Sequence, residues 1–148
     1  RHDSLLGISW SVAILSQLIG KNTKYLTFDS ILGHHGILAE NNMKRPLYFF
    51  NEILVFFENA KVVPLNFSKE IYGLALFKNN KKYYLLTNVT NTIIDANLIE
   101  VNKIKQSYLN NKNFNDINEN NFTFFNFFET SNKIKFEAYE TKLIEVIK

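Results

Sequence analysis

Two stretches in the first third of the chain repeat hydrophobic residues at helical spacing. Over Leu5–Ile19 apolar residues recur mostly every three or four positions, which predicts one amphipathic helix. Gly20 follows at the position that a helix C-terminus favours. The second stretch opens at Pro46, because proline is tolerated in a first helical turn, and runs to Phe57. It is apolar on nearly every side, which is typical of a helix packed between two layers.

The segment between these helices predicts one strand and a loop. Lys24–Leu32 is rich in β-branched and aromatic residues, as strands are. Gly33 and Gly36 then bracket two adjacent histidines. A lone strand would leave both of its edges unpaired. We therefore expect this strand to join a sheet whose other members precede Arg1, and the chain to be the C-terminal piece of a longer protein.

Beyond Asn59 the pattern changes to short β-rich runs, and we expect six to eight antiparallel strands. The run Phe77–Tyr83 joins two apolar segments through a short Asn-Asn turn, which predicts a hairpin. Residues 110–121 are polar and rich in asparagine, which predicts a loop. The run "FTFFNFFE", residues 122–129, predicts a strand that supplies one face of a sandwich core. The fold class expected for the whole chain is α+β.

Composition narrows the range of functions. Of the 148 residues 46% are hydrophobic, but no apolar run approaches the roughly 18 residues of a membrane span. The net charge is only +3 and the lysines are spread out, so we expect no nucleic-acid partner. The chain has no cysteine, which excludes disulfides, thiolate zinc sites and a cysteine nucleophile. No glycine-rich phosphate loop or nucleophile elbow occurs, and we expect no cofactor.

Four stretches together resemble the end of a clan-A type glycoside hydrolase, closest to the heparanase-like or β-xylosidase-like families. "SWSVAILSQLIGKNTKYLTFDS" resembles the seventh barrel helix leading into the eighth strand, and "GHHGILAENNMKRPLYFFNEIL" the loop after that strand. "IYGLALFKNNKKYYLLTNVT" resembles a hairpin of the C-terminal sandwich, and "FEAYETKLIEV" its closing strand. Such closing strands usually carry a proline before the aromatic residue, whereas this chain has Glu137-Ala138-Tyr139.

This resemblance implies two domains. Residues 1–58 would be the last helix–strand–helix of a TIM-type (β/α)8 barrel, and residues 59–148 an antiparallel β-sandwich. The two catalytic glutamates of the clan end the fourth and seventh barrel strands, which would both lie upstream of Arg1. No residue here inherits a catalytic role, although the parent protein would be a glycosidase.

The resemblance also implies partners, a role and a location. The carbohydrate substrate would bind through the missing barrel, and the upstream barrel segment of the same protein would be the second partner. The sandwich would stabilise the barrel. Such enzymes act outside the cytoplasm, so the location would be secreted or periplasmic.

The candidate substrate-binding residues are Asp29, His34 and His35. Asp29 lies on the expected strand and the two histidines follow it, and the working face of a barrel is built from such strand ends and loops. Alternatively, both histidines are solvated loop residues and Asp29 faces outward at the strand end. We expect no metal site, because adjacent histidines point in different directions and a third ligand at suitable spacing is absent.

Three further interpretations follow from the residues. Trp10 lies mid-helix among apolar neighbours, so we predict that it belongs to the core. Asn88-Val89-Thr90 matches a glycosylation acceptor, which matters only in a eukaryotic secretory route. The alternative function is a self-standing β-rich module with a helical cap that binds glycan or protein through the phenylalanine run.

Overall fold

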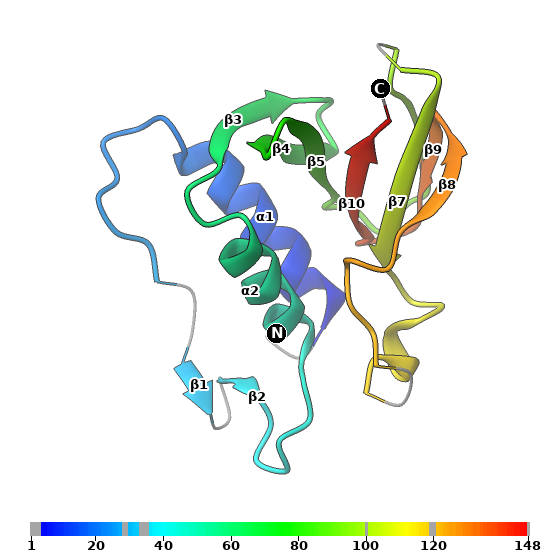
Figure 1. Cartoon of the computed structure of the whole chain (residues 1–148). Helices are drawn as coiled ribbons and strands as arrows, with labels where there is room; N and C mark the ends of the chain where they lie inside the picture. The colour runs from blue at the N-terminus through cyan, green and yellow to red at the C-terminus, as the bar shows by residue number, and fades with distance from the viewer. Residues whose placement is uncertain (1–3, 28–29, 33–35, 100, 119–120, 148) are drawn as a thin grey trace.

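The computed structural model describes residues 4–27, 30–32, 36–99, 101–118 and 121–147 (Figure 1). Within these ranges the elements follow in the order α1 (Leu5–Leu18), β1 (Ser30–Leu32), β2 (Gly36–Leu38), α2 (Pro46–Phe56), β3 (Lys61–Asn66), β4 (Ile71–Lys78), β5 (Lys81–Asn88), β6 (Ile94–Asn97), β7 (Lys103–Leu109), the 3-10 helix η1 (Phe114–Asp116), β8 (Phe128–Ser131), β9 (Lys133–Phe136) and β10 (Thr141–Val146).

A six-stranded antiparallel sheet forms the middle layer. Its strand order is β3-β4-β5-β10-β7-β8, and β6 pairs with β9 in a separate two-stranded sheet. Helices α1 and α2 cover one face of the large sheet, and the β6-β9 pair covers the other (Figure 1). The β-rich part is thus a sandwich-like α+β arrangement, as expected. No helix among the described residues is long and apolar enough to cross a membrane.

The central strands are apolar on both faces because both faces are covered. Leu85 packs on the helix side, while the next residue, Leu86, packs on the β6-β9 side. The same division holds for Leu143 and Ile144 in β10. A sheet that is buried on two sides has near-continuous hydrophobic strands in place of strict alternation. This is why alternation along the last strand is only partial in the sequence.

Several local predictions are confirmed. Helix α1 ends at Leu18, and Gly20 adopts a φ of +79°, which suits glycine after a helix. Helix α2 begins at Pro46. The predicted hairpin is formed by β4 and β5, with Asn79 at φ 51° and Asn80 at φ 60°. Two consecutive positive φ values are those of a type I′ turn, the tight turn that matches the twist of paired strands.

Three local predictions are wrong. Of the described residues in the strand expected over Lys24–Leu32, residues 24–27 are irregular and Ser30–Leu32 form a strand. In the run of residues 122–129 only the last two belong to β8, because Thr123 and Asn126 form a turn that sends the phenylalanines toward α2. Trp10 is 57% exposed, since α1 turns Leu5, Ile8 and Val12 toward the sheet and leaves Trp10 on the outer side.

Candidate functional site

The predicted sugar-binding residues Asp29, His34 and His35 lie outside the described residues, but the strands on either side of the histidine loop are described. Strands β1 and β2 flank the loop and pair in parallel, with Ser30 opposite Gly36. Arg45 donates from Nη1 to the Gly36 carbonyl at 2.6 Å and from its backbone N–H to the Ile37 carbonyl at 3.0 Å.

Glycine is required at position 36. A Cβ atom placed there would lie 2.5 Å from the backbone carbonyl carbon of Leu32, closer than real contacts allow. The backbones of β1 and β2 therefore approach closely at Gly36, and Arg45 binds the β2 side of this pair.

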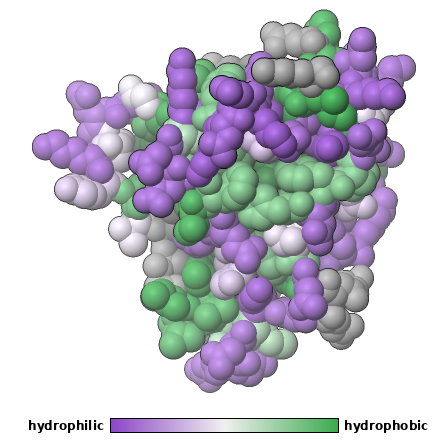
Figure 2. Space-filling view, in the orientation of Figure 1, coloured by the Kyte–Doolittle hydropathy of each residue, from purple (hydrophilic) through white to green (hydrophobic). Residues whose placement is uncertain are grey.

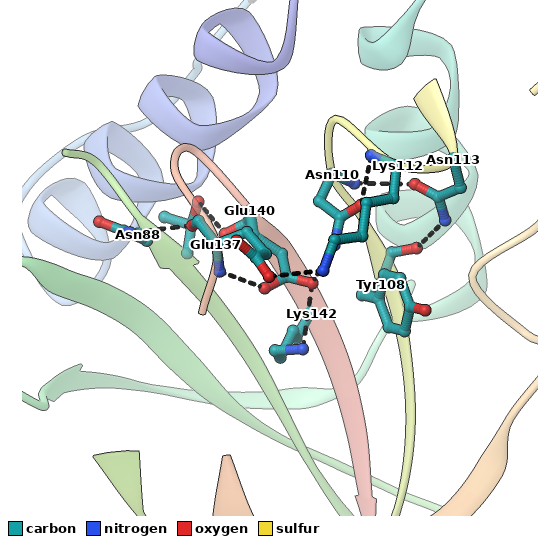
Figure 3. Close-up of polar contacts among 9 residues, drawn as sticks. Asn88, Tyr108, Asn110, Lys112, Asn113, Glu137, Glu140 and Lys142 are labelled. Carbon is teal, nitrogen blue, oxygen red and sulfur yellow. Dashed lines mark hydrogen bonds and ion pairs between the residues drawn. The ribbon is translucent and has the colours of Figure 1, made fainter. Parts of the chain in front are cut away.

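A second polar arrangement is buried where β7, β9 and β10 meet, and Glu140 is at its centre (Figure 3). Glu140 is only 1% exposed. Its Oε1 accepts hydrogen bonds from Asn110 Nδ2 at 2.8 Å and from Lys142 Nζ at 3.1 Å. Its Oε2 accepts from the backbone N–H of Glu137 at 2.7 Å. The carboxylate thus joins the end of β7, the turn after β9 and the start of β10.

The partner of this carboxylate, Lys142, is also buried. Its Nζ lies 4.7 Å from the ring centroid of Tyr108 and 5.4 Å from that of Phe136, within cation–π range. Burial lowers the pKa of Lys142, because removing the ammonium from water disfavours the charged form. The Glu140 carboxylate opposes this shift and holds the charge in place.

The same cluster shapes the chain after β7. The Asn110 N–H donates to Asn113 Oδ1 at 2.9 Å, and Asn113 Nδ2 donates to the Tyr108 carbonyl at 2.8 Å (Figure 3). At the surface, Lys112 Nζ donates to Glu137 Oε1 at 2.7 Å, and this contact lowers the pKa of Glu137. Every carboxylate here faces a cation or an amide, so the arrangement acts as a structural clamp rather than an acid–base pair.

The described residues also bear on metal binding and glycosylation. Among them no group of three or more histidine, cysteine, aspartate or glutamate side chains could hold a metal ion. Asn88 of the glycosylation pattern is 0% exposed. Its Nδ2 donates to the Thr92 carbonyl at 2.7 Å and to the Glu137 carbonyl at 2.9 Å. The amide nitrogen that would carry a glycan is therefore unavailable in the folded chain.

The clamp was not predicted from the sequence, although a signal for it exists. Glu140 and Lys142 are two residues apart beside the apolar pair Leu143-Ile144, and residues two apart in an extended chain lie on one face. A buried charge is costly unless it is paired. The two residues therefore could have been matched with each other once the strand was expected to be buried.

Comparison with known proteins places the fold. No protein-family model and no curated protein matches this chain. Among solved structures it resembles a GH30 endoxylanase from Clostridium papyrosolvens C71, with a TM-score of 0.63 and 10% sequence identity. The match covers 99% of this chain and 39% of that endoxylanase.

This likeness establishes the fold and not the activity. The chain spans well under half the length of the endoxylanase that it matches. The expected similarity to a glycoside hydrolase is confirmed at the level of fold. The assignment to the heparanase-like or β-xylosidase-like families stays a prediction.

Proposed function

We propose that this chain is the C-terminal, non-catalytic part of a glycoside hydrolase that acts on poly- or oligosaccharides. The observation that carries the proposal is the match of nearly the whole chain to 39% of an endoxylanase. A fragment of that size is too small to hold the complete barrel of about 250 residues that such chemistry uses. The two catalytic carboxylates would belong to the remaining segment.

The division proposed for the chain is a barrel remnant at residues 1–58 and a sandwich at residues 59–148. Strands β1 and β2 support it, because parallel strands normally have both faces covered by other elements. Here Ile31 of β1 is 69% exposed, and Leu32 is exposed as well. Figure 2 shows hydrophobic surface at the lower left, over β1 and β2. Barrel strands from upstream would cover this surface.

The outer side of α1 supports the same proposal. Trp10 and Ile14 are exposed there and line an apolar cavity of about 390 Å³ together with Tyr72 and Val89. An exposed apolar helix face of this kind marks a surface that another protein segment or a ligand covers. We infer that the upstream segment packs on this face, so the sandwich and α1 together stabilise the barrel.

Asp29, which precedes β1, and His34 and His35, which lie between β1 and β2, would line the sugar site of the parent enzyme. The parallel pairing of β1 with β2 supports this proposal, because it places a strand end beside the histidine loop, as a barrel would. A secreted or periplasmic location belongs to the same proposal and rests on the resemblance to glycoside hydrolases.

Sugar binding by these three residues is tested in the protein that the whole reading frame encodes. We expect His34→Ala, His35→Ala and Asp29→Asn each to raise the KM for xylan, by about tenfold for a lost sugar hydrogen bond. Lys103→Ala changes an exposed residue of β7 and serves as the control. Unchanged KM values in all three variants, each fully folded, would show that these residues do not contact the sugar.

A further inference from the structure

A cavity of about 280 Å³ lies where β8 separates from β7. The ladder between these strands ends at the pair Gln106–Phe128. The last residues of β7 therefore face this cavity and not a continuing strand. The residues that line it include Tyr108, Asn113, Phe122, Thr123, Asn126 and Phe128. We call it the edge cavity.

The walls of the edge cavity are held in place before any ligand arrives. On one wall, Ser107 Oγ donates to the carbonyl of Phe124, whose side chain is in the core. The Asn126 N–H donates to the Thr123 carbonyl at 3.4 Å, which closes a tight turn. On the other wall, the clamp around Glu140 fixes Tyr108 through its carbonyl and its ring. Such a preformed wall reduces the entropy that binding would cost.

The chemistry of the lining is aromatic and neutral. The rings of Tyr108 and Phe128 meet edge to face, with centroids 5.7 Å apart, and Phe128 is exposed. None of the described residues that line the cavity carries a charge. Within the part of the chain that the structure describes, neither the Tyr108 hydroxyl nor the Asn126 side-chain amide has a hydrogen-bond partner. Figure 3 shows the Tyr108 phenol pointing away from the Glu140 clamp.

We propose that the edge cavity binds one neutral sugar ring of a polysaccharide, at a site on the sandwich separate from the histidine loop. Aromatic rings provide flat apolar surfaces for the C–H face of a pyranose, while the free amide and hydroxyl bond its hydroxyl groups. The neutral side chains among the described lining residues disfavour acidic or cationic ligands. The volume lies at the low end for ligand pockets, which suits a single ring.

The test uses the 148-residue chain and two probes, xylotetraose and cellotetraose, with binding measured by NMR titration. We expect at least one probe to shift the resonances of residues around Tyr108 and Asn126. Asn126→Ala and Tyr108→Phe should each weaken binding about tenfold, the cost of one lost hydrogen bond. Tyr108→Phe keeps the ring and its contacts with Phe128 and Lys142.

The matched control is Asn91→Ala, which removes an exposed amide outside the edge cavity and should leave affinity unchanged. The proposal is overturned if neither probe binds at millimolar concentration, or if the Asn126 and Tyr108 variants bind like the parent chain. Binding of acidic oligosaccharides alone would also contradict it. The titration measures binding and not hydrolysis. Its outcome therefore distinguishes failure of the edge-cavity proposal from failure of the proposed function.

Discussion

At the scale of single residues, the structure depends on a charge pair that is removed from water. Glu140 and Lys142 are both buried, and each has the other as its ionic partner. Removing one member of such a pair leaves the other charge buried without compensation, which costs about 3–5 kcal/mol. Replacing both members costs much less, because no unpaired charge remains.

We therefore expect Lys142→Met to lower the free energy of unfolding by about 3–5 kcal/mol, since the Glu140 carboxylate keeps only its amide partners. Glu140→Gln added to Lys142→Met should recover part of that loss. Urea denaturation of the two single variants and the double variant measures the coupling. Losses that simply add would show that the two side chains do not interact.

The lowered pKa of Lys142 has a consequence for alkaline stability. In the unfolded chain the lysine holds its proton up to its ordinary pKa of 10.5, whereas in the folded chain it loses the proton at lower pH. Between these two values the unfolded state binds more protons, so this residue makes stability rise with pH. The stability difference between the parent chain and Lys142→Met should then grow as pH approaches 10.5.

Lys81 supplies the control for this experiment. Its hydrogen bond to Glu145 raises its pKa, so its contribution is fully present below 10.5 and is lost only above that pH. The difference between the parent chain and Lys81→Met should stay constant from pH 7 to 10.5. Parallel pH profiles for the Lys81 and Lys142 variants would show that burial does not shift Lys142.

At the scale of elements, the β4–β5 hairpin offers the sharpest test of local sequence. Asn80 has a φ of 60°, where a Cβ atom is costly and glycine is free. Asn-Gly is also the preferred pair for a type I′ turn. We expect Asn80→Gly to raise the free energy of unfolding by up to about 1 kcal/mol and Asn80→Ala to lower it by a similar amount. Equal stabilities of both variants in thermal unfolding would contradict the turn assignment.

The elements that the sequence predicts well have local causes. Pro46, Gly20 and the Asn79-Asn80 turn each act on the backbone within a few residues, so their effects are visible in the sequence. The side of α1 on which Trp10 lies depends on which helix face meets the sheet, and this is a property of the tertiary packing. The phenylalanines of residues 122–129 were expected in a strand because their composition favours one. Their packing against α2 and the turn at Thr123 override that tendency.

The candidate sites divide in the same way. The histidine loop was found from glycines and adjacent polar residues, whereas the clamp required knowing that β10 is covered on both faces. The edge cavity depends on where β8 leaves β7, which no local pattern encodes. Sequence patterns therefore identify turns and helix ends, and the structure adds the sites formed by residues far apart in the chain.

At the scale of the whole molecule, two apolar surfaces are exposed among the described residues. One is formed by Ile31 and Leu32 of β1, and the other by Trp10 and Ile14 on the outer side of α1. The barrel proposed for the larger protein would cover both surfaces.

The central claim is tested most directly by measuring hydrolysis of xylan and other neutral polysaccharides. The assay compares the product of the whole reading frame with the 148-residue chain. The proposal predicts that the protein encoded by the whole reading frame releases reducing sugar from the polysaccharide. The 148-residue chain alone should release none, because the proposal assigns the catalytic carboxylates to the upstream barrel segment. Hydrolysis by the chain alone, or a whole product that lacks a barrel and cleaves no polysaccharide, would contradict it.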